Sequence, residues 1–564
     1  MTLHPAQETD FGCRATAGMT PSSLLVAAFV SASLLAGSVF GYSSSRADAR
    51  AQAPALATPT FVISGRGWGH GVGLAQWGAY GFAKQGATYD EILAHYYTGT
   101  TLGPAQLARI RVQLAAGRRQ LTVGSTAPFT VRDGIGQLWH LAAGEQTFGP
   151  GLLIKTSDVQ QPQQLPAPVT FLPGASPLRF SGRPYRGQLL VSVAGGTLRA
   201  VNSVGLEPYL FGVVPSEVPR TWPPEALKAQ AVAARSYALA KRTTGSWFDV
   251  YADTRSQVYL GIAGEAPSTT AAVQETAGEV VLYAGRVATT YFFSSSGGRT
   301  SAAEEVWNEP VPYLKSVDDP YDTFSPHHRW GPFVVSAGRL DRFLKAPGRL
   351  MDVRTTVGPS GRVGTVTAIG SQGDSSADGA DVRRGLDLRS TWFRIGVLSL
   401  ATPETPVTFG GRVSLSGVAR SLPAVRVEQR EHGAAWRALG RVARGPNGSV
   451  TVKAKPKAPT DYRLASGAAR SRLAHVAVAP LVRFRGLKGA SVLRGFARPL
   501  FPGATIAVQQ LNGGRWTTIV RAPIDESGNF TARVPLSPGE YRARLAPGRG
   551  FVPGVSPTLR VGPA

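Results

Sequence analysis

Residues 207–241 read EPYLFGVVPSEVPRTWPPEALKAQAVAARSYALAK, and they contain the acidic side chain whose surroundings best suit acid chemistry, Glu217. Its neighbours in the sequence are valines, prolines and Trp222. A carboxyl group among apolar side chains keeps its proton to higher pH, because its charged form is poorly solvated there. Glu217 is therefore a candidate proton donor near neutral pH. The alternative is an ordinary loop glutamate with a structural role.

A long helix is predicted to begin at residues 221–224, because proline is tolerated in the first turn of a helix. Leu227 and several alanines recur at helical spacing, which indicates close packing against a neighbouring element. Lys228 and Arg235 lie seven residues apart, so two helical turns place both cations on one stripe. The alternative is a buried alanine-rich helix with two solvated cations.

Several strings in the chain resemble motifs of the SpoIID/LytB family of bacterial cell-wall proteins. They are VVPSEVP (213–219), WPPEALKAQAVAARSYAL (222–239), TRSQVY (254–259), SSSGGRT (294–300) and GRGWGHGVGLAQWGAYG (65–81). The resemblance covers residues 60–400 of the 564. Sporulation members of this family are lytic transglycosylases that act on glycan strands without stem peptides. Its vegetative members are described as modifiers of a wall amidase.

The resemblance implies a mechanism that needs one carboxyl group. Most glycosidases use two, whereas in a lytic transglycosylase the substrate's own C6 hydroxyl attacks the anomeric carbon and leaves a 1,6-anhydromuramyl end. By motif match, Glu217 takes the catalytic role. The same match implies substrate contacts by Lys228, Arg235, Tyr237, Gln257, Tyr259, Ser296, His70 and Gln76. For each of these side chains packing within the fold is the alternative, and we expect neither a cofactor nor a metal ion.

The glycine-rich stretch 65–81 departs from the family pattern by its position. In the family it usually lies near the domain's C-terminal end, after a strand that resembles TWFRIG at residues 391–396. Here it comes first, so we expect a circular rearrangement that brings it to the same place from the other end of the chain. Its alternating glycines indicate an extended backbone that another segment approaches closely. His70 within it either contacts sugar or is a structural hydrogen-bonding group.

The SSSGGRT stretch also allows two other chemistries. A serine hydrolase would combine a serine of this stretch with a histidine and an aspartate, but the G-x-S-x-G pattern of a nucleophile elbow is missing there. The same histidines and aspartates offer a weak metal-binding alternative. The side chains concerned are Ser296, His327, His328, Asp318 and Asp319.

At 564 residues the chain is too long for one core, and its patterns predict an α+β fold with several domains. Short alternating segments from 110 to 206 predict a β-rich platform, and the polar stretch 372–379 predicts a loop. Two segments beyond Pro403 repeat each other, with Trp436 and Trp516 aligned 80 residues apart. This repeat indicates two immunoglobulin-like β-sandwiches. The predicted divisions are 1–57 (signal peptide or membrane anchor and linker), 58–402 (SpoIID/LytB-like domain with the glycine-rich element), 403–482 and 483–564 (the two β-sandwich repeats).

The net charge of +25 is concentrated towards the C-terminus, where residues 411–564 contain 25 Lys and Arg against 6 Asp and Glu. A basic region outside the cell attracts anionic wall polymers or phospholipid headgroups, although a simple spacer is the alternative. Residues 24–42 lack charge and predict either a cleaved signal peptide or a membrane anchor. Both place the rest of the chain outside the membrane, which argues against nucleic acid as partner. The single cysteine, Cys13, precedes this segment, so the mature chain has no internal disulfide.

Together these observations favour an exported, cell-wall-associated lytic transglycosylase that cleaves peptidoglycan glycan strands lacking stem peptides. The alternative is a non-catalytic wall-binding protein that enhances an N-acetylmuramoyl-L-alanine amidase. Glu217 within its motif favours the enzyme, whereas the displaced glycine-rich stretch and the long basic tail leave room for the enhancer. Sporulation, division and wall turnover are all compatible with the sequence.

Overall fold

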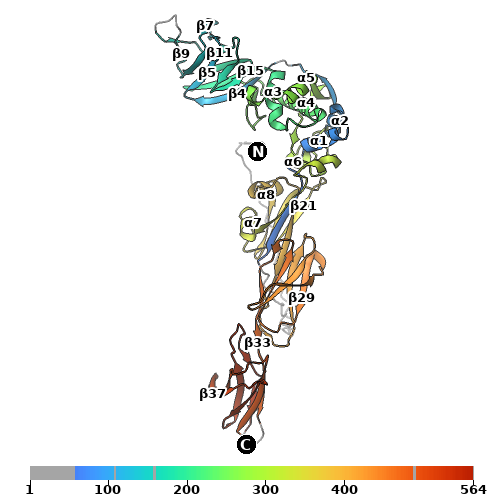
Figure 1. Cartoon of the computed structure of the whole chain (residues 1–564), viewed down its shortest axis with the longest axis vertical. Coiled ribbons are helices and arrows are strands. Elements are labelled where there is room, and N and C mark those ends of the chain that lie inside the picture. The colour runs from blue at the N-terminus through green and yellow to red at the C-terminus, as the bar shows by residue number, and fades with distance from the viewer. Residues whose placement is uncertain (1–57, 107–108, 156–160, 487–490, 563–564) are drawn as a thin grey trace, which may run out of the picture.

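The computed structural model describes residues 58–106, 109–155, 161–486 and 491–562, and the predicted export segment at 24–42 lies outside them. The described residues form an elongated molecule, with a strand-rich platform and a group of helices at one end and two strand-built units at the other (Figure 1). Strands make up 43% and helices 18% of the structure, which confirms the predicted α+β class. None of the helices in the described ranges is long and apolar enough to cross a membrane.

The platform, residues 109–205 with one later strand, contains a seven-stranded sheet and a four-stranded sheet that share one core. The larger sheet has the order β16-β4-β15-β14-β11-β6-β7, and the smaller has the order β13-β12-β5-β8. The alternating apolar residues of this stretch therefore form strands as expected. The strands are β4 (Arg109–Arg118), β5 (Leu121–Ser125), β6 (Phe129–Arg132), β7 (Leu138–Leu141), β8 (Gly144–Phe148), β9 (Leu153–Ile154), β10 (Gln163–Gln164), β11 (Val169–Leu172), β12 (Leu178–Phe180), β13 (Arg183–Tyr185), β14 (Gln188–Ala194), β15 (Thr197–Gly205) and β16 (Val250–Tyr251).

The helical unit lies beside the platform and combines residues 74–104 with residues 206–324. Its centre is the alanine-rich helix α4, which packs against α1, α2, α3 and α5. Small side chains let these helices approach closely, and most of the residues of α4 are buried. The helices are α1 (Gln76–Lys84), α2 (Tyr89–Tyr96), α3 (Leu206–Glu217), α4 (Pro224–Ala240), α5 (Pro267–Glu275) and α6 (Glu304–Trp307), with 3₁₀ turns η1 (Gly261–Gly264) and η2 (Pro320–Phe324). The strands are β2 (Leu74–Ala75), β3 (Thr101–Pro104), β17 (Glu279–Tyr283), β18 (Arg286–Val287) and β19 (Phe292–Phe293).

Helix α3 was not predicted from the sequence. It contains Gly212 and Pro215, residues that disfavour a helix interior. Packing overrides this preference, because the helix buries Tyr209, Leu210 and the valines that follow. Gly212 is required by a close approach: a Cβ at this position would lie 2.9 Å from the carbonyl oxygen of Gly261.

The middle unit, residues 60–65 with 330–400, brings the two ends of the predicted SpoIID/LytB-like domain together. Strand β1 lies between β20 and β24 and pairs with β24 from Thr60 opposite Leu398 to Gly65 opposite Phe393. The glycine-rich stretch therefore leaves the sheet beside the TWFRIG segment, where the family pattern leads us to expect it. The elements are β1 (Thr60–Gly65), β20 (Trp330–Ser336), α7 (Ala337–Leu344), β21 (Leu350–Val357), β22 (Val363–Gly370), β23 (Gly373–Asp378), α8 (Gly379–Leu386) and β24 (Phe393–Leu400).

The prediction of a loop at residues 372–379 was wrong. Residues 373–378 form β23, which pairs with β22 from Gly373 opposite Gly370 to Asp378 opposite Thr365. The strand is polar because most of its side chains remain at least partly exposed. Backbone hydrogen bonds to the neighbouring strand stabilise β23. The strand therefore lacks the alternating apolar residues from which it could have been predicted.

The first β unit, residues 407–479, shares a sheet with the middle unit. Strand β24 pairs with β26, so one five-stranded sheet crosses the predicted division at 402 and 403. A second sheet, β28-β27-β30-β31 with β32, packs on it around a common core. The elements are β25 (Val407–Thr408), β26 (Val413–Arg420), β27 (Arg426–Glu431), β28 (Arg437–Arg441), the 3₁₀ turn η3 (Pro446–Gly448), β29 (Ser449–Ala454), β30 (Thr460–Ser466), β31 (Ala469–Arg470), β32 (Ala474–Val476) and β33 (Val478–Ala479).

The second β unit, residues 481–561, has a core of its own between a three-stranded sheet and a larger sheet. The larger sheet has the order β37-β36-β39-β40, with β41 also paired to β39. Both β units thus have two packed sheets, and the immunoglobulin-like assignment stays a prediction. The strands are β34 (Leu481–Gly486), β35 (Val492–Arg498), β36 (Thr505–Asn512), β37 (Arg515–Pro523), β38 (Asn529–Arg533), β39 (Gly539–Leu545), β40 (Gly554–Val555) and β41 (Leu559–Val561).

Candidate functional site

Glu217 is the last residue of α3, which ends there because Val218 adopts an extended backbone conformation. The side chain is half-buried, and burial raises the pKa of its carboxyl from 4.5 to about 7. Its place at the C-terminal end of a helix also disfavours a negative charge. Burial is the one cause of the shift, so no neighbouring charge among the described residues accounts for it. Near neutral pH the protonated and ionised forms of Glu217 are both populated.

Two tyrosines accompany this carboxyl. Burial, the nearby Tyr291 and the charge of Glu217 raise the pKa of Tyr237 to about 12. Burial and the same charge raise the pKa of Tyr209 well above its usual value. The Tyr209 hydroxyl donates a hydrogen bond to Oε1 of Gln257 at 3.1 Å. Tyr237 therefore remains a neutral hydroxyl, half-buried near Glu217, that can donate a hydrogen bond to a ligand.

Gln76 links the glycine-rich stretch to the end of α3. Its side-chain nitrogen donates to the backbone oxygen of Glu217 at 3.3 Å and to Oε1 of Gln230 at 3.4 Å. The contact joins residues 141 positions apart in the chain. The glycine-rich stretch therefore forms one wall beside Glu217, although Gln76 itself is largely buried.

A pocket of about 490 Å³ lies at the start of α4, whose first residues follow Glu217 closely in the sequence. Its lining residues are Tyr80, Ala83, Lys84, Thr221, Trp222, Pro223 and Pro224. Trp222 packs against Trp77 and Tyr80, with ring centres 5.0 and 5.2 Å apart, and the half-exposed Phe324 lies 5.8 Å from Tyr80. Aromatic faces beside hydroxyl and amine groups suit a sugar ring, which has apolar faces and polar edges.

Sequence reasoning did not assign this aromatic group. Trp77 and Tyr80 lie on α1, whereas Trp222 follows α3, and Phe324 belongs to η2. The residues are scattered over the chain, and no spacing in the sequence shows that they meet. The one available signal was the density of aromatic residues in the GLAQWGAYG string and after Glu217.

His70 has a structural role in the geometry of the glycine-rich stretch. The backbone N–H of Val72 donates to its Nδ1 at 3.1 Å, so Nδ1 is the unprotonated nitrogen. Its Nε2 then carries the proton and donates to the carbonyl oxygen of Phe292 at 3.2 Å. With both nitrogens bonded to backbone, the predicted sugar contact of His70 is not supported.

Arg235 is fully buried and bonded to four protein acceptors. Its guanidinium donates to both carboxylate oxygens of Glu207 and to the carbonyl oxygens of Val273 and Glu279. Lys228 forms ion pairs with Glu275 at 2.7 Å and Glu225 at 2.9 Å, and these carboxylates raise its pKa.

Neither cation contributes to the shifted pKa of Glu217. Direct contact of Arg235 with substrate is not supported either, because its side chain has no exposed surface.

Three other predicted substrate contacts are buried as well. Gln257 accepts from Tyr209 and donates to the Ala234 carbonyl at 3.3 Å. The Tyr259 hydroxyl donates to Asn202 at 2.8 Å. Ser296 accepts from the N–H of Gly298 at 3.0 Å and has no exposed surface. These hydrogen bonds stabilise the fold around the site. Because the three side chains are buried, the structure does not support sugar contact by Gln257, Tyr259 or Ser296.

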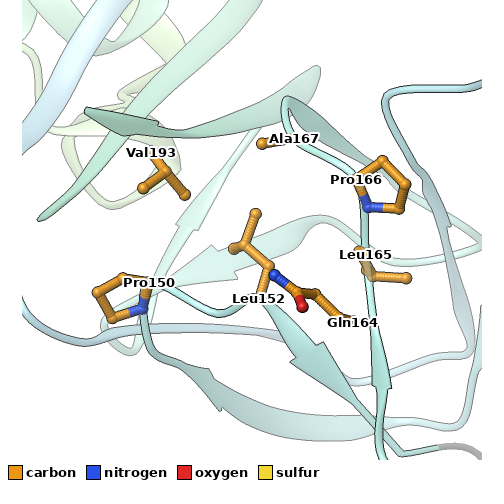
Figure 2. A pocket seen from close by; sticks show the side chains of 7 residues that line it. All are labelled: Pro150, Leu152, Gln164, Leu165, Pro166, Ala167 and Val193. Atoms are coloured by element: carbon orange, nitrogen blue, oxygen red, sulfur yellow. The ribbon is translucent and has the colours of Figure 1, made fainter. Parts of the chain in front are cut away.

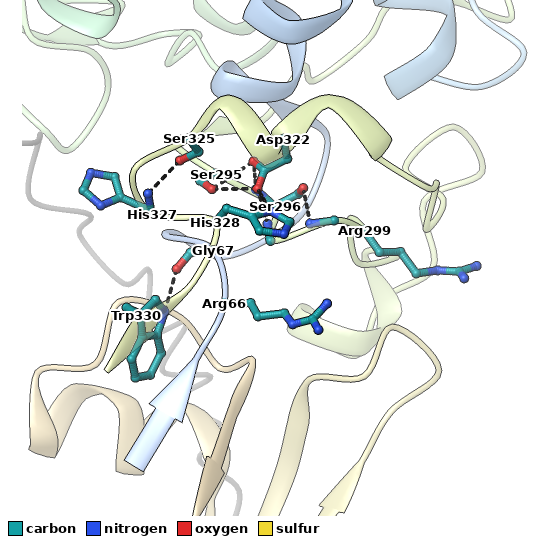
Figure 3. A network of polar contacts seen from close by, with 12 residues as sticks. Arg66, Gly67, Ser295, Ser296, Arg299, Asp322, Ser325, His327, His328 and Trp330 are labelled. Atoms are coloured by element: carbon teal, nitrogen blue, oxygen red, sulfur yellow. Dashed lines mark hydrogen bonds and ion pairs between the residues drawn. The ribbon is translucent and has the colours of Figure 1, made fainter. Parts of the chain in front are cut away.

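Asp322 organises the SSSGGRT stretch (Figure 3). Its carboxylate accepts from the Ser295 hydroxyl, from the N–H groups of Ser296 and Gly297, and lies 2.9 Å from Nδ1 of His328. The Ser295 hydroxyl and the His328 ring therefore bond to the same carboxylate, whereas the predicted nucleophile Ser296 contributes its backbone N–H, an arrangement that does not support a serine–histidine relay.

The remaining members of the hydrolase and metal alternatives make other contacts. Asp318 pairs with Arg299 at 3.1 Å, and the ring of His327 packs on Trp68 at 4.4 Å. Asp319 is fully buried, and burial with the charge of Asp322 raises its pKa to about 7. Within the described ranges no group of three His, Cys, Asp or Glu side chains could hold a metal ion.

Comparison with known proteins matches the part of the chain that contains Glu217. Residues 194–283, which include Glu217 and all of α3 and α4, match the family model SpoIID, Stage II sporulation protein. The segment that holds Glu217 is therefore similar to the SpoIID/LytB family. We refer to residues 194–283 as the SpoIID segment.

Curated relatives of the SpoIID segment cover part of the chain. Stage II sporulation protein D of Bacillus subtilis is 32% identical over 218 residues, which are 35% of this chain and 61% of the relative. The Amidase enhancer of the same organism is 42% identical over 132 residues, 23% of this chain and 17% of the relative. An uncharacterised protein of Brachyspira hyodysenteriae is 42% identical over 141 residues, 24% of this chain and 38% of its own length. The chain thus spans less than two thirds of each of these relatives.

One solved structure, titled Cytokine receptor complex, aligns with 26% of this chain and 90% of its own chain. Its TM-score is 0.17 and its sequence identity 16%, values too low to support an inference.

A second pocket, of about 470 Å³, lies in the platform (Figure 2). It is lined by Pro150, Leu152, Gln164, Leu165, Pro166, Ala167 and Val193. These side chains include no acid, base or nucleophile. This pocket therefore offers no group for acid chemistry.

Replacing Arg235 by Met should destabilise the domain by roughly 3–5 kcal/mol, because Glu207 is left with an uncompensated charge. Calorimetric unfolding of the full chain measures this loss as a lowered transition temperature. Arg220→Met is the matched control, since Arg220 is an exposed cation of the same domain. Adding Glu207→Gln should recover part of the loss. Equal, small effects of Arg235→Met and Arg220→Met would contradict the structural role of the pair.

Glu217→Gln should stabilise the protein at pH 8.5 and have little effect at pH 4. The folded-state pKa of about 7 lies above the ordinary 4.5, so protonation favours the folded state and this stability is lost as pH rises through 7. The amide removes a penalty of roughly 2–3 kcal/mol at high pH. Thermal unfolding of the wild type and of Glu217→Gln at each pH measures the difference in stability. Asp319 titrates in both proteins, so its contribution cancels in this difference. A pH-independent difference would refute the buried position of Glu217.

Proposed function

We propose that the protein is an exported lytic transglycosylase that cleaves peptidoglycan glycan strands lacking stem peptides. One observation carries the proposal. A half-buried carboxyl with a pKa of about 7 lies at the end of α3, five residues before Trp222, which lines a pocket that suits sugar rings, and among the described residues burial is the one cause of its raised pKa. The family relationship of the SpoIID segment supports the choice of cell-wall glycan as substrate.

In this mechanism the protonated Glu217 donates its proton to the glycosidic oxygen as the bond from this oxygen to the anomeric carbon breaks. The C6 hydroxyl of the same sugar forms a new bond to the anomeric carbon, and its proton passes to the ionised Glu217. The product is a 1,6-anhydro end, and no water is consumed. A carboxyl with a pKa near the working pH suits both steps, because it must first donate and then accept a proton.

The lone position of Glu217 favours this mechanism over ordinary hydrolysis. A hydrolase needs a second carboxylate within several ångströms, as nucleophile or to activate water. A carboxylate close to Glu217 would raise its pKa further, whereas burial is the one cause of the shift that the described residues supply. Tyr237 and the backbone held by Gln76 would position the sugar, and the aromatic pocket would bind the strand beyond the scissile bond.

Incubating the purified protein with stem-free glycan strands should release products with anhydro ends, detected by mass spectrometry. Glu217→Gln keeps the size of the side chain and should lower the rate at least a thousandfold, because the amide cannot donate the proton. The rate of the wild type should fall above pH 7 as Glu217 ionises. Unchanged cleavage by Glu217→Gln would reject the assigned residue, and reducing ends in place of anhydro ends would indicate a hydrolase.

Tyr80→Ala should raise the KM for glycan strands roughly tenfold with a smaller change in kcat, because the substitution removes one aromatic wall of the pocket. Phe333→Ala is the matched control: Phe333 is a partly exposed aromatic residue on β20, in the middle unit. Steady-state kinetics on strands of defined length measures both parameters. Equal KM values for the two variants would exclude the pocket as a glycan subsite.

A second candidate function is supported by the 42% identity to the protein named Amidase enhancer. In that case the chain would bind the wall and stimulate an amidase without cleaving glycan. Amidase turnover measured with added wild type or Glu217→Gln separates the two functions. Equal stimulation by both proteins, without anhydro products, would favour the enhancer.

A further inference from the structure

The two β units carry the same pair of side chains on their outer faces. In the first unit the guanidinium of Arg463 lies 3.8 Å from the ring centre of Trp436, and in the second the guanidinium of Arg542 lies 4.3 Å from that of Trp516. Both arginines belong to equivalent strands, β30 and β39, which pair with β27 and β36. The units can therefore be compared side chain by side chain.

The residue opposite this arginine differs between the units. In the first unit Glu428 faces Arg463 across the strands, and its carboxylate binds Arg463 at 2.8 Å. It also forms ion pairs with Arg426 and Arg470, at 2.9 and 3.0 Å. One carboxylate thus neutralises part of a cluster of three arginines.

In the second unit the neutral Gln509 takes the place of this carboxylate. It faces Arg542 across the strands, and its Oε1 accepts from Nε of Arg542 at 2.8 Å. An amide oxygen holds the guanidinium in position but does not compensate its charge.

Two further arginines share this face. The register places Ala507 opposite both Arg521 on β37 and Arg544 on β39. Ile506 and Val508 on either side of Ala507 are buried in the core, so the arginines point to the solvent side. Among the described residues neither Arg521 nor Arg544 has a carboxylate within ion-pair distance. Burial and the charge of Arg544 lower the pKa of Arg542, which agrees with uncompensated like charges.

We propose that the face formed by Arg521, Arg542, Arg544 and Trp516, the arginine face, binds a polyol phosphate chain of the cell wall. Guanidinium groups bind phosphate through paired hydrogen bonds, and a chain with an anion at every repeat can contact several arginines at once. The choice of a wall polymer over other polyanions rests on the extracytoplasmic location in the proposed function. The first unit, with Glu428 at the centre of its cluster, acts as a spacer.

The test measures binding of poly(glycerol phosphate) to the full chain at several salt concentrations. Gln509→Glu reproduces the arrangement of the first unit and should weaken binding about tenfold, because it places a carboxylate beside Arg542. Arg494→Gln lowers the net charge by the same amount on the exposed surface of the other sheet, and it should have little effect. Circular dichroism checks that Gln509→Glu remains folded. Equal weakening by both variants, or by neither, would overturn the arginine face.

Two other polyanions test the choice of partner. Duplex DNA of the same charge and vesicles with anionic lipids should bind more weakly and lose less affinity on Gln509→Glu. If either of them bound with the same affinity as poly(glycerol phosphate) and lost as much affinity on Gln509→Glu, the assignment to a wall polymer would be overturned. All binding is measured in the Glu217→Gln background, so the result does not depend on glycan cleavage. Failure of the proposed catalysis and failure of the arginine face are thereby distinguishable.

Discussion

The proposed chemistry depends on the incomplete solvation of one carboxyl group, that of Glu217. Helix α3 ends at this residue, the glycine-rich stretch covers its backbone through Gln76, and burial raises the pKa of its side chain to about 7. This environment costs folding stability whenever Glu217 is ionised. A group kept at such a cost is expected where chemistry needs both of its protonation states.

The surrounding fold serves to hold α3 in place. The fully buried Arg235 joins Glu207 at the start of α3 to the carbonyl groups of residues 273 and 279. Alanines of α4 allow the other helices to pack closely around it. The pairing of β1 with β24 brings the glycine-rich stretch to the same side. Residues that the family motif marks as important therefore include one half-buried carboxyl with a raised pKa and several buried side chains that are bonded within the fold.

Much of the fold and of the candidate site could be predicted from local sequence, and the exceptions have physical reasons. The apolar neighbours of Glu217 correctly predicted its raised pKa, and Pro224 correctly marked the start of α4. Helix α3 was missed because Gly212 and Pro215 in its interior disfavour a helix that packing stabilises. Motif membership does not distinguish a side chain that contacts ligand from one that supports the fold, so Arg235, Gln257 and Ser296 required the structure. The aromatic pocket was missed because its members come from separate segments.

The most direct test of the account is the titration of the Glu217 carboxyl itself. Infrared difference spectroscopy of the wild type, with Glu217→Gln as reference, isolates the protonated form of this one group across the pH range. The account predicts a midpoint of about 7. A midpoint near the ordinary value of 4.5 would show a well-solvated carboxylate and would contradict its role as proton donor.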